Sequence, residues 1–241
     1  MLWRVPRIWQ DGDCWIIGGG FSLPIQFGVP VDLINNVCLG KASITCYSSY
    51  LKELYNKHVI GVNNAYFLGD WIDFLFFGDS SWHLKHRKSL LSWNGIKVSC
   101  APKFGNMTAK KREGIKFLAK DKSKSQGITE KSGHVSWNGN SGAAAINLAV
   151  HLGVKRILLL GFDMNMDKYS HWFGSHSEVK SVRSKTEFNK IYQSKLRTFQ
   201  RHLKGFPVIA KDAKRLGVEI ININPDSAIT AFSKVNLKEV L

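Results

Sequence analysis

The sequence predicts one α/β domain of Rossmann-like design spanning residues 1–241, with a mostly parallel sheet and helices on both faces. Short, almost wholly apolar runs at 74–77 and 157–160 are typical of parallel strands that are buried on both faces. Helical stretches alternate with such runs along the chain, which is the pattern of a parallel sheet with crossover connections. A chain of 241 residues also fits one such domain better than two small ones.

The first half of the chain is expected to open with a strand at residues 14–17, which runs into the glycine-rich turn 18–20. The segment 24–47 contains Pro24 and Pro30, and we expect loop with some short strand there. The elements that follow are a short serine-capped helix at 48–57, strands at 59–62 and 73–77, a helix at 81–92 and a strand at 96–99.

The second half begins with residues 101–135, which are rich in lysine, glycine and serine, and we expect a basic insertion or flap over the site. A polar loop with histidines at 164–184 is expected to act as a lid. The regular elements of this half are helices at 143–152, 186–203 and 207–216 and strands at 155–160 and 218–223.

Polar residues follow the ends of the predicted strands. In an open parallel sheet the carboxyl ends of the strands form one edge, and ligands bind in the crevice outside that edge. The sequence therefore predicts a ligand site built from strand-end residues, namely Ser22, Asn63, Asn64, Asp79, Asp163 and Asn224.

Two segments are candidates for binding an anion. Gly19, Gly20 and Ser22 belong to a turn in which the backbone can approach a phosphate and N–H groups can bind it. This turn is neither a Walker A loop nor G-x-G-x-x-G, and a simple tight turn is the alternative. Ser141 and Gly142 open a predicted helix and offer a hydroxyl and free amides to a nucleotide, with an ordinary helix cap as the alternative.

Amide and imidazole side chains supply further candidates. Asn63 and Asn64 can hydrogen-bond a base or ribose, or serve as turn residues. His171 lies in a loop over the sheet edge, where a histidine can act as a general base near neutral pH. His176 is the second histidine of that loop, and a solvated or capping side chain is the alternative for both.

Carboxylates raise the question of a metal. Asp163, together with Asp167 and Asp79, could hold Mg²⁺ through oxygen ligands. The alternative for Asp163, which we favour, is a structural acceptor for N–H groups of the surrounding loops.

The charge is strongly basic and unevenly distributed. There are 34 Lys and Arg against 18 Asp and Glu, which gives a formal net charge of +16. The excess lies in residues 83–134, with 13 basic and 3 acidic residues, and in residues 168–215, with 12 and 3. Such segregation favours a polyanionic partner, and a merely soluble basic surface is the alternative. We expect Lys110, Lys111 and Arg112 to contribute to binding without being needed for folding.

The four cysteines, at positions 14, 38, 46 and 100, contain no Cys-x-x-Cys pair, which excludes zinc-ribbon and thioredoxin-like sites. The first residues carry Arg4, Pro6 and Arg7 without a long apolar run, so we expect no signal peptide. No segment has the length needed to span a bilayer, and a reducing cytoplasm is the expected location.

Five ordered blocks of sequence carry a resemblance to a known family. They are 14–23 (CWIIGGGFSL), 61–66 (GVNNAY), 140–143 (NSGA) with 152–163 (LGVKRILLLGFD), 170–174 (SHWFG) and 217–227 (GVEIININPDS). Together they resemble the bacterial single-domain sialyltransferases that use CMP-activated sialic acid. The same pattern occurs in hydroxymethylpterin diphosphokinase-like proteins and in phage-encoded proteins, which the chain resembles most closely.

The resemblance implies that Ser22, Asn63 and Ser141 contact the nucleotide, that Asp163 shapes the site and that His171 is the general base on the acceptor hydroxyl. Three positions depart from the family pattern. Gly19 and Gly78 stand where the sialyltransferases have Asn, and Asn165 stands where they have a tyrosine for the leaving phosphate. These departures leave the donor sugar open and point to Lys or Arg of the basic segments for the phosphate.

The first functional hypothesis is a glycosyltransferase-like enzyme with a nucleotide-activated donor of the CMP- or UDP-sugar type. Its polyanionic acceptor is expected to be nucleic acid carrying a hydroxylated base, ahead of a surface glycan, in the host cytoplasm if the protein is phage-encoded. The alternatives are a Mg²⁺-dependent diphosphokinase-like enzyme acting on a small heterocycle and a non-catalytic nucleic-acid-binding module. A homo-oligomer is left open.

Overall fold

The computed structural model describes residues 2–108, 112–165, 171–174 and 185–241. Within them, one eight-stranded sheet has the order β10-β9-β8-β1-β2-β3-β4-β5, and all neighbouring strands are parallel. The strands are β1 (Asp13–Ile17), β2 (Val59–Val62), β3 (Phe74–Phe77), β4 (Ile96–Ser99), β5 (Lys116–Phe117), β8 (Arg156–Leu160), β9 (Glu219–Asn222) and β10 (Ser233–Lys234). The predicted Rossmann-like α/β class is confirmed.

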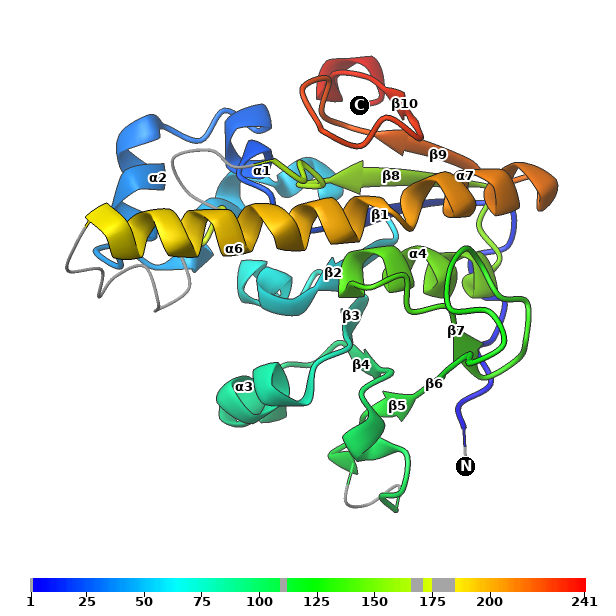
Figure 1. The fold of residues 1–241 in the computed structure, drawn as a ribbon. Helices are drawn as coiled ribbons and strands as arrows, with labels where there is room; N and C mark the ends of the chain where they lie inside the picture. The colour runs from blue at the N-terminus through cyan, green and yellow to red at the C-terminus, as the bar shows by residue number, and fades with distance from the viewer. Residues whose placement is uncertain (1, 109–111, 166–170, 175–184) are drawn as a thin grey trace.

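Helices cover both faces of the sheet (Figure 1). The α-helices are α1 (Ser22–Gln26), α2 (Val31–Cys38), α3 (Ser80–Ser92), α4 (Ser141–Leu152), α6 (Lys185–Leu203) and α7 (Phe206–Arg215). Short 3-10 helices are η1 (Ile44–Tyr50), η2 (Lys52–Leu54), η3 (Asn63–Leu68), η4 (Pro102–Phe104) and η6 (Leu237–Glu239). Among the described residues, no helix is long and apolar enough to cross a membrane.

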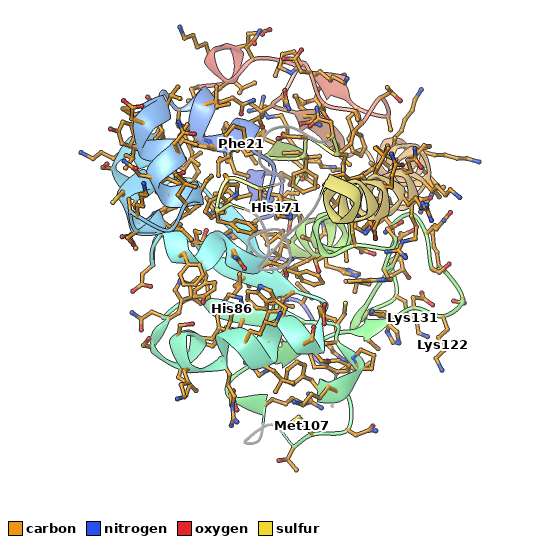
Figure 2. The ribbon with its side chains drawn as sticks, turned by 60° about the vertical axis from the view of Figure 1, so that its left-hand side comes forward. Phe21, His86, Met107, Lys122, Lys131 and His171 are labelled. Atoms are coloured by element: carbon orange, nitrogen blue, oxygen red, sulfur yellow. The ribbon has the colours of Figure 1, made fainter. Side chains whose placement is uncertain are left out.

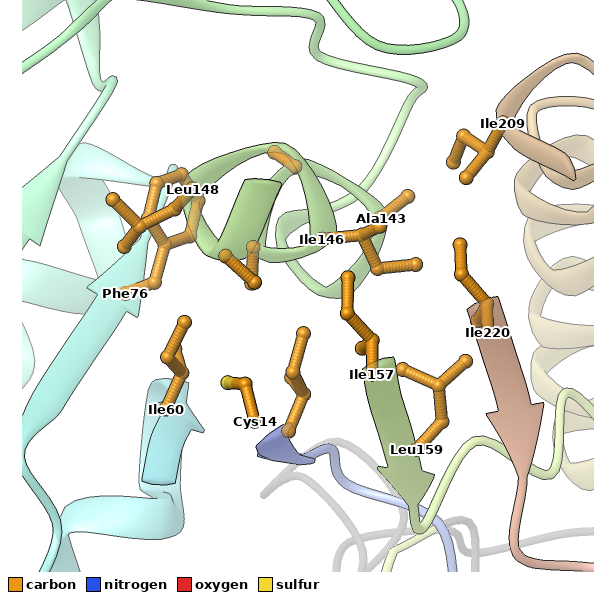
Figure 3. Close-up of a cluster of buried hydrophobic side chains, with 14 of the residues drawn as sticks. Cys14, Ile60, Phe76, Ala143, Ile146, Leu148, Ile157, Leu159, Ile209 and Ile220 are labelled. Atoms are coloured by element: carbon orange, nitrogen blue, oxygen red, sulfur yellow. The ribbon is translucent and has the colours of Figure 1, made fainter. Parts of the chain in front are cut away.

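Alternate residues of each strand point to opposite faces, and this alternation builds two core layers. On one face, Cys14, Ile157 and Leu159 pack with side chains of α4 and α7, such as Ile146 and Ile209 (Figure 3). On the other face, residues such as Trp15, Ile17 and Leu158 pack with side chains of α1, α2 and the 3-10 helices. Because both faces of β1 and β8 are covered, these strands read as continuous apolar runs in the sequence.

The first strand, β1, lies in the middle of the sheet, and this placement creates a crevice at the carboxyl ends of the central strands. From β1 the chain moves outward through β2 to β5, and it then returns to β8 on the other side of β1 before it moves out to β10. The connections that leave β1 and β8 therefore diverge at their carboxyl ends. In doubly wound folds this switch point is where ligands bind.

The turns after β1 and β8 are joined by backbone hydrogen bonds at this point. Gly18 N donates to Leu160 O at 2.8 Å, and Gly20 N donates to Gly161 O at 2.7 Å. A Cβ atom at position 20 would lie 2.5 Å from Cγ of Asp163, so only glycine fits there without displacement of its neighbours.

The prediction of loop and short strand for residues 24–47 is wrong, because α1 and α2 lie there. Pro30 is the N-cap residue of α2, where a missing N–H costs no helical hydrogen bond. Ile34, Val37 and Cys38 are buried with the i, i+3, i+4 spacing of a helix, which the two prolines obscured. The helix predicted for residues 48–57 is replaced by the 3-10 helices η1 and η2.

The described part of residues 101–135, expected as a basic insertion or flap, is integrated into the fold. β5 extends the main sheet beside β4, and β6 (Ala119–Lys120) pairs with β7 (His134–Val135). The Asp121 carboxylate orders the intervening turn by accepting hydrogen bonds from Ser123 Oγ and Thr129 Oγ1, each at 2.6 Å.

Arg112 is part of this packing, which corrects its expected role. The side chain is buried, its guanidinium donates to the carbonyl oxygens of Met107 at 2.8 Å and Gly105 at 3.2 Å, and it lies over the ring of Phe117. Its removal would leave these carbonyl groups without this donor, so Arg112 contributes to the stability of the fold. Lys110 and Lys111 lie outside the described residues.

Candidate functional site

A pocket of about 170 Å³ lies at the carboxyl edge of the sheet, where β1 and β8 diverge. Its described walls come from the turns after β1, β2 and β8, from α3, from the start of α4, from His171 and Phe173, and from one face of α6. It brings together six of the predicted site residues, namely Gly19, Asn63, Asn64, Ser141, Gly142 and His171. Gly20, Ser22, Asp79 and Asp163 do not line it.

Asp163 holds the turn after β1 in place from behind the pocket. Its carboxylate accepts hydrogen bonds from Ser22 N at 2.9 Å, Ser22 Oγ at 2.5 Å and Asn224 Nδ2 at 2.9 Å. The side chain is buried, so three partners compensate the cost of taking its charge out of water. Asp163, Ser22 and Asn224 thus join three strand ends, and this arrangement supports the structural interpretation of Asp163.

His171 is fixed over the glycine turn by its neighbours. Nδ1 of His171 lies 3.2 Å from the carbonyl oxygen of Gly19, and the ring stacks on Phe173 at 4.8 Å between centroids. The fully buried Trp172 donates to Gly18 O from its indole at 2.8 Å and to Gly19 O from its backbone at 3.2 Å. In a neutral imidazole whose Nδ1 donates to a carbonyl, Nε2 is the basic nitrogen.

Figure 2 shows His171 between the N-terminal elements and α6, with Met107, Lys122 and Lys131 of the segment 101–135 at the periphery. None of the described residues of that segment lines the pocket. The rest of the predicted lid, including Asp167, Ser170 and His176, lies outside the described residues.

The first turn of α4 lines the pocket with donors that have no partner among the described residues. The side chain of Asn140 caps the helix by accepting from Ala143 N at 2.8 Å, and Ser141 Oγ accepts from Gly78 N at 3.1 Å. The backbone N–H groups of Ser141 and Gly142 bond to no other described residue. Nδ2 of Asn140 and Oδ1 of Asn63 are also buried without a partner in the described chain. Such groups are costly unless a ligand or water satisfies them.

Trp82 of α3 forms the opposite wall and is held by a chain of contacts. Its indole donates to Asn64 Oδ1 at 2.7 Å and stacks on His86 at 4.4 Å between centroids. His86 Nδ1 lies 2.9 Å from Tyr66 Oη, and burial raises the pKa of the Tyr66 phenol. The amide of Asn64 is thereby oriented, since its oxygen is engaged and its NH₂ group remains for a ligand.

Phe199 and His202 of α6 line the pocket and were missed by the sequence analysis. They are separated by three positions and so lie on the same face of the helix, a spacing that is readable in the sequence. Without knowledge of where α6 packs, that face could not be assigned to a pocket. Burial, and then the neighbouring Arg201, lowers the pKa of the His202 imidazole.

The predicted Mg²⁺ ligands do not form a metal site in the described part of the chain. Asp163 is engaged by Ser22 and Asn224, while Asp79 accepts from Ser81 N at 2.8 Å as the N-cap of α3. No group of three or more His, Cys, Asp or Glu side chains suited to a metal occurs among the described residues. Asp163 and Asp79 thus serve the fold as hydrogen-bond acceptors, and Asp167 lies outside the described residues.

The fold and the pocket together define a Rossmann-like α/β protein with a pocket at its topological switch point. No family model matches the chain, and no curated protein matches its sequence. Among solved structures, the chain is similar to the sialyltransferase CstII from Campylobacter jejuni in complex with cytidine-5'-monophosphate, at 14% identity and a TM-score of 0.49 over 92% of this chain and 84% of that one.

A second structure of this kind is the sialyltransferase CST-II in complex with a trisaccharide acceptor and CMP. It matches at 15% identity and a TM-score of 0.47 over 92% of this chain and 85% of that one. At these values the similarity concerns the course of the chain and does not identify a reaction.

Proposed function

We propose that this protein is a transferase that moves a group from a nucleotide-activated donor of the CMP- or UDP-sugar type to a hydroxyl acceptor. The observation that carries this proposal is the juxtaposition, in one pocket, of an imidazole anchored on Gly19 and the open first turn of α4. The first is suited to take a proton from a hydroxyl group, and the second is suited to bind an anion. The ordered blocks of sequence that resemble sialyltransferases favour the same reaction.

The proposed reaction assigns one role to His171. Nε2 of His171 takes the proton of the acceptor hydroxyl as its oxygen attacks the anomeric carbon of the donor sugar. The bond between that carbon and the phosphate oxygen breaks, and the nucleotide leaves with the electron pair. The products are the glycosylated acceptor, the nucleotide and an imidazolium that returns its proton to water. The hydrogen bond to Gly19 orients the ring for this transfer.

The donor would be recognised by neutral groups. The N–H groups of Ser141 and Gly142 face the phosphate, while Asn63 and Asn64 offer amides to the base or ribose. Gly19 leaves space for the imidazole of His171, and Gly20, Ser22 and Asp163 support the turn. The described pocket of about 170 Å³ is smaller than the roughly 300–1,000 Å³ of sites that enclose a whole ligand, so it would hold only part of such a donor.

We further propose a polyanionic acceptor, with nucleic acid carrying a hydroxylated base favoured over a surface glycan. The support is electrostatic. The helix α6, which lines the pocket through Phe199 and His202, also carries exposed cations at Arg197 and Arg201, and Lys204 follows it. A phage origin and a cytoplasmic location remain predictions from the sequence.

The diphosphokinase-like alternative is less well supported, because Asp163 and Asp79, its two predicted Mg²⁺ ligands in the described chain, already accept hydrogen bonds within the fold. A non-catalytic module would bind nucleic acid without turning over any donor. Activity measured with added Mg²⁺ and with EDTA separates the diphosphokinase-like enzyme from the transferase. Turnover of a donor separates the non-catalytic module from both enzymes.

The test is a thermal-shift panel with CMP, UDP, GDP, ADP and their sugars, followed by donor-turnover assays with the ligands that bind. A ligand at 100 times its Kd stabilises the folded state by about 2.7 kcal/mol, which is readily measured. We expect CMP or UDP compounds to raise the melting temperature and EDTA to have no effect. Binding of ADP alone among these ligands, with turnover of ATP that needs Mg²⁺, would overturn the proposal.

A further inference from the structure

The pocket has an unusual charge inventory for a site that binds a phosphate. Among its described lining residues there is no Lys, Arg, Asp or Glu, and its titratable side chains are His171 and His202. The phosphate was expected to contact Lys or Arg of the basic segments, yet none of these lines the described pocket. Among the described lining residues, the groups that can meet the negative charge of a phosphate are backbone N–H groups, amides and an imidazole.

The two histidines are held differently. His171 is anchored through Nδ1 on Gly19, whereas neither ring nitrogen of His202 hydrogen-bonds to another described residue. His202 is thus a donor or acceptor that the fold itself does not use. It projects from the last turn of α6 into the pocket to which the first turn of α4 presents the unpartnered N–H groups of Ser141 and Gly142.

We infer that His202 contacts the phosphate of the bound nucleotide and, in its imidazolium form, supplies the positive charge that the rest of the described pocket lacks. This inference deepens the proposed function and rests on it. It gives the two imidazoles separate tasks, since His171 acts on the acceptor hydroxyl and His202 on the leaving nucleotide. A phosphate placed between His202 and the start of α4 receives hydrogen bonds from both sides.

Proton uptake is the signature of such a contact. Burial and Arg201 keep the pKa of His202 below its ordinary value in the free protein, so the imidazole is neutral at pH 7.5. The other titratable side chain that faces it in the described pocket is His171, while the α3, α4, β1 and β8 segments contribute none. A bound phosphate favours the imidazolium, so nucleotide binding should tighten as the pH falls from 8 to 6.5.

The experiment measures the affinities of CMP, UDP, cytidine and uridine by titration calorimetry at pH 6.5 and pH 8. The variants are His202→Gln, which cannot be protonated, and His202→Lys, which keeps a charge at both pH values. The matched control is His58→Gln, at an exposed histidine next to β2 on the amino edge of the sheet. Thermal unfolding of each variant establishes that it is folded.

We expect His202→Gln to weaken CMP or UDP binding about 10- to 100-fold at pH 6.5, as for the loss of one charged hydrogen bond, and to leave nucleoside binding unchanged. The tightening between pH 8 and 6.5 should shrink in His202→Gln relative to wild type and His58→Gln. His202→Lys should bind CMP or UDP with little such dependence on pH.

Equal affinities and equal pH dependence in wild type and His202→Gln would overturn the role of His202. The proposed transferase function would not be affected by that result. The same holds if His202→Gln weakens nucleosides as much as nucleotides, because the histidine would then act on the base or on the pocket shape. If the wild-type protein binds none of the four compounds, both the proposed function and this inference fail.

Discussion

Asp163 and Ser22 are joined by two hydrogen bonds although 141 positions separate them in the chain. Through this contact the turn after β8 fixes the turn after β1, and the floor of the pocket becomes a product of two strands that are neighbours only in the folded sheet. The carboxylate thus acts on the site indirectly, because it holds the glycine turn on which His171 rests.

Replacement of Asp163 by Ala should lower the free energy of unfolding by about 2–4 kcal/mol, because it leaves Ser22 and Asn224 unpaired in a buried place. Asp79→Ala is the matched control, since it removes an exposed helix cap worth about 1 kcal/mol. Urea denaturation measures both. Equal losses would contradict the structural role of Asp163.

Substitution of Gly19 should affect turnover, whereas substitution of Gly20 should affect stability. A Cβ atom at Gly19 would lie 2.9 Å from Nδ1 of His171, whereas one at Gly20 would lie 2.5 Å from Cγ of Asp163. Gly19→Ala should displace the imidazole and lower turnover by about 100-fold with little change in melting temperature. Gly20→Ala should cost roughly 1–3 kcal/mol of stability. Thermal unfolding and donor turnover of both variants test this difference, and the reverse order would contradict it.

His171→Ala should lower turnover by about 10²–10⁴-fold, the usual contribution of a general base, and should leave CMP or UDP binding nearly unchanged. The comparison is His176→Ala, which we expect to lower turnover much less than His171→Ala. Steady-state assays and calorimetry on the same preparations measure the two effects. Full activity of His171→Ala would remove its assignment as the base, and loss of nucleotide binding would make it a structural residue.

Binding of duplex DNA should weaken steeply with salt if the basic surface beside the pocket contacts phosphates, because counterions are released on binding. Arg197→Glu with Lys204→Glu should lower the affinity and reduce the slope of log K against log salt by about 1 for each lost contact. Lys57→Glu with Lys155→Glu makes the same change in net charge at the amino edge of the sheet. Filter binding over a range of salt concentrations distinguishes them, and identical slopes would place the interface elsewhere.

The turn built on Asp121 should make the stability of the protein sensitive to acid. Hydrogen bonds from Ser123 and Thr129 lower the pKa of the Asp121 carboxyl in the folded state. A lowered folded-state pKa means that this stabilisation is present above the unfolded pKa of about 3.9 and is lost as the pH falls through the folded value. The stability difference between wild type and Asp121→Asn should therefore be constant between pH 5 and 7 and shrink below pH 4. A difference that does not vary with pH would contradict this.

The sequence by itself determined the class of the fold and the elements that form its centre. The runs at 59–62 and 74–77 became β2 and β3, because strands covered on both faces must be apolar at every position. Their polar successors, such as Asn63 and Asn64, reached the same edge, since parallel strands share a direction. The segment 24–47 was misread because proline punctuation is ambiguous between a loop and a helix start.

Only the tertiary structure decided which of these residues meet. The local sequence pattern carries no information on which strands are neighbours. The pairing of β1 with β8 places Asp163 behind the turn that follows β1, whereas His171 lies over that turn. It also decided that Arg112 is buried and that His202 faces the pocket. The physical reason is that a side chain's role follows from what packs against it, and those partners lie far away in the sequence.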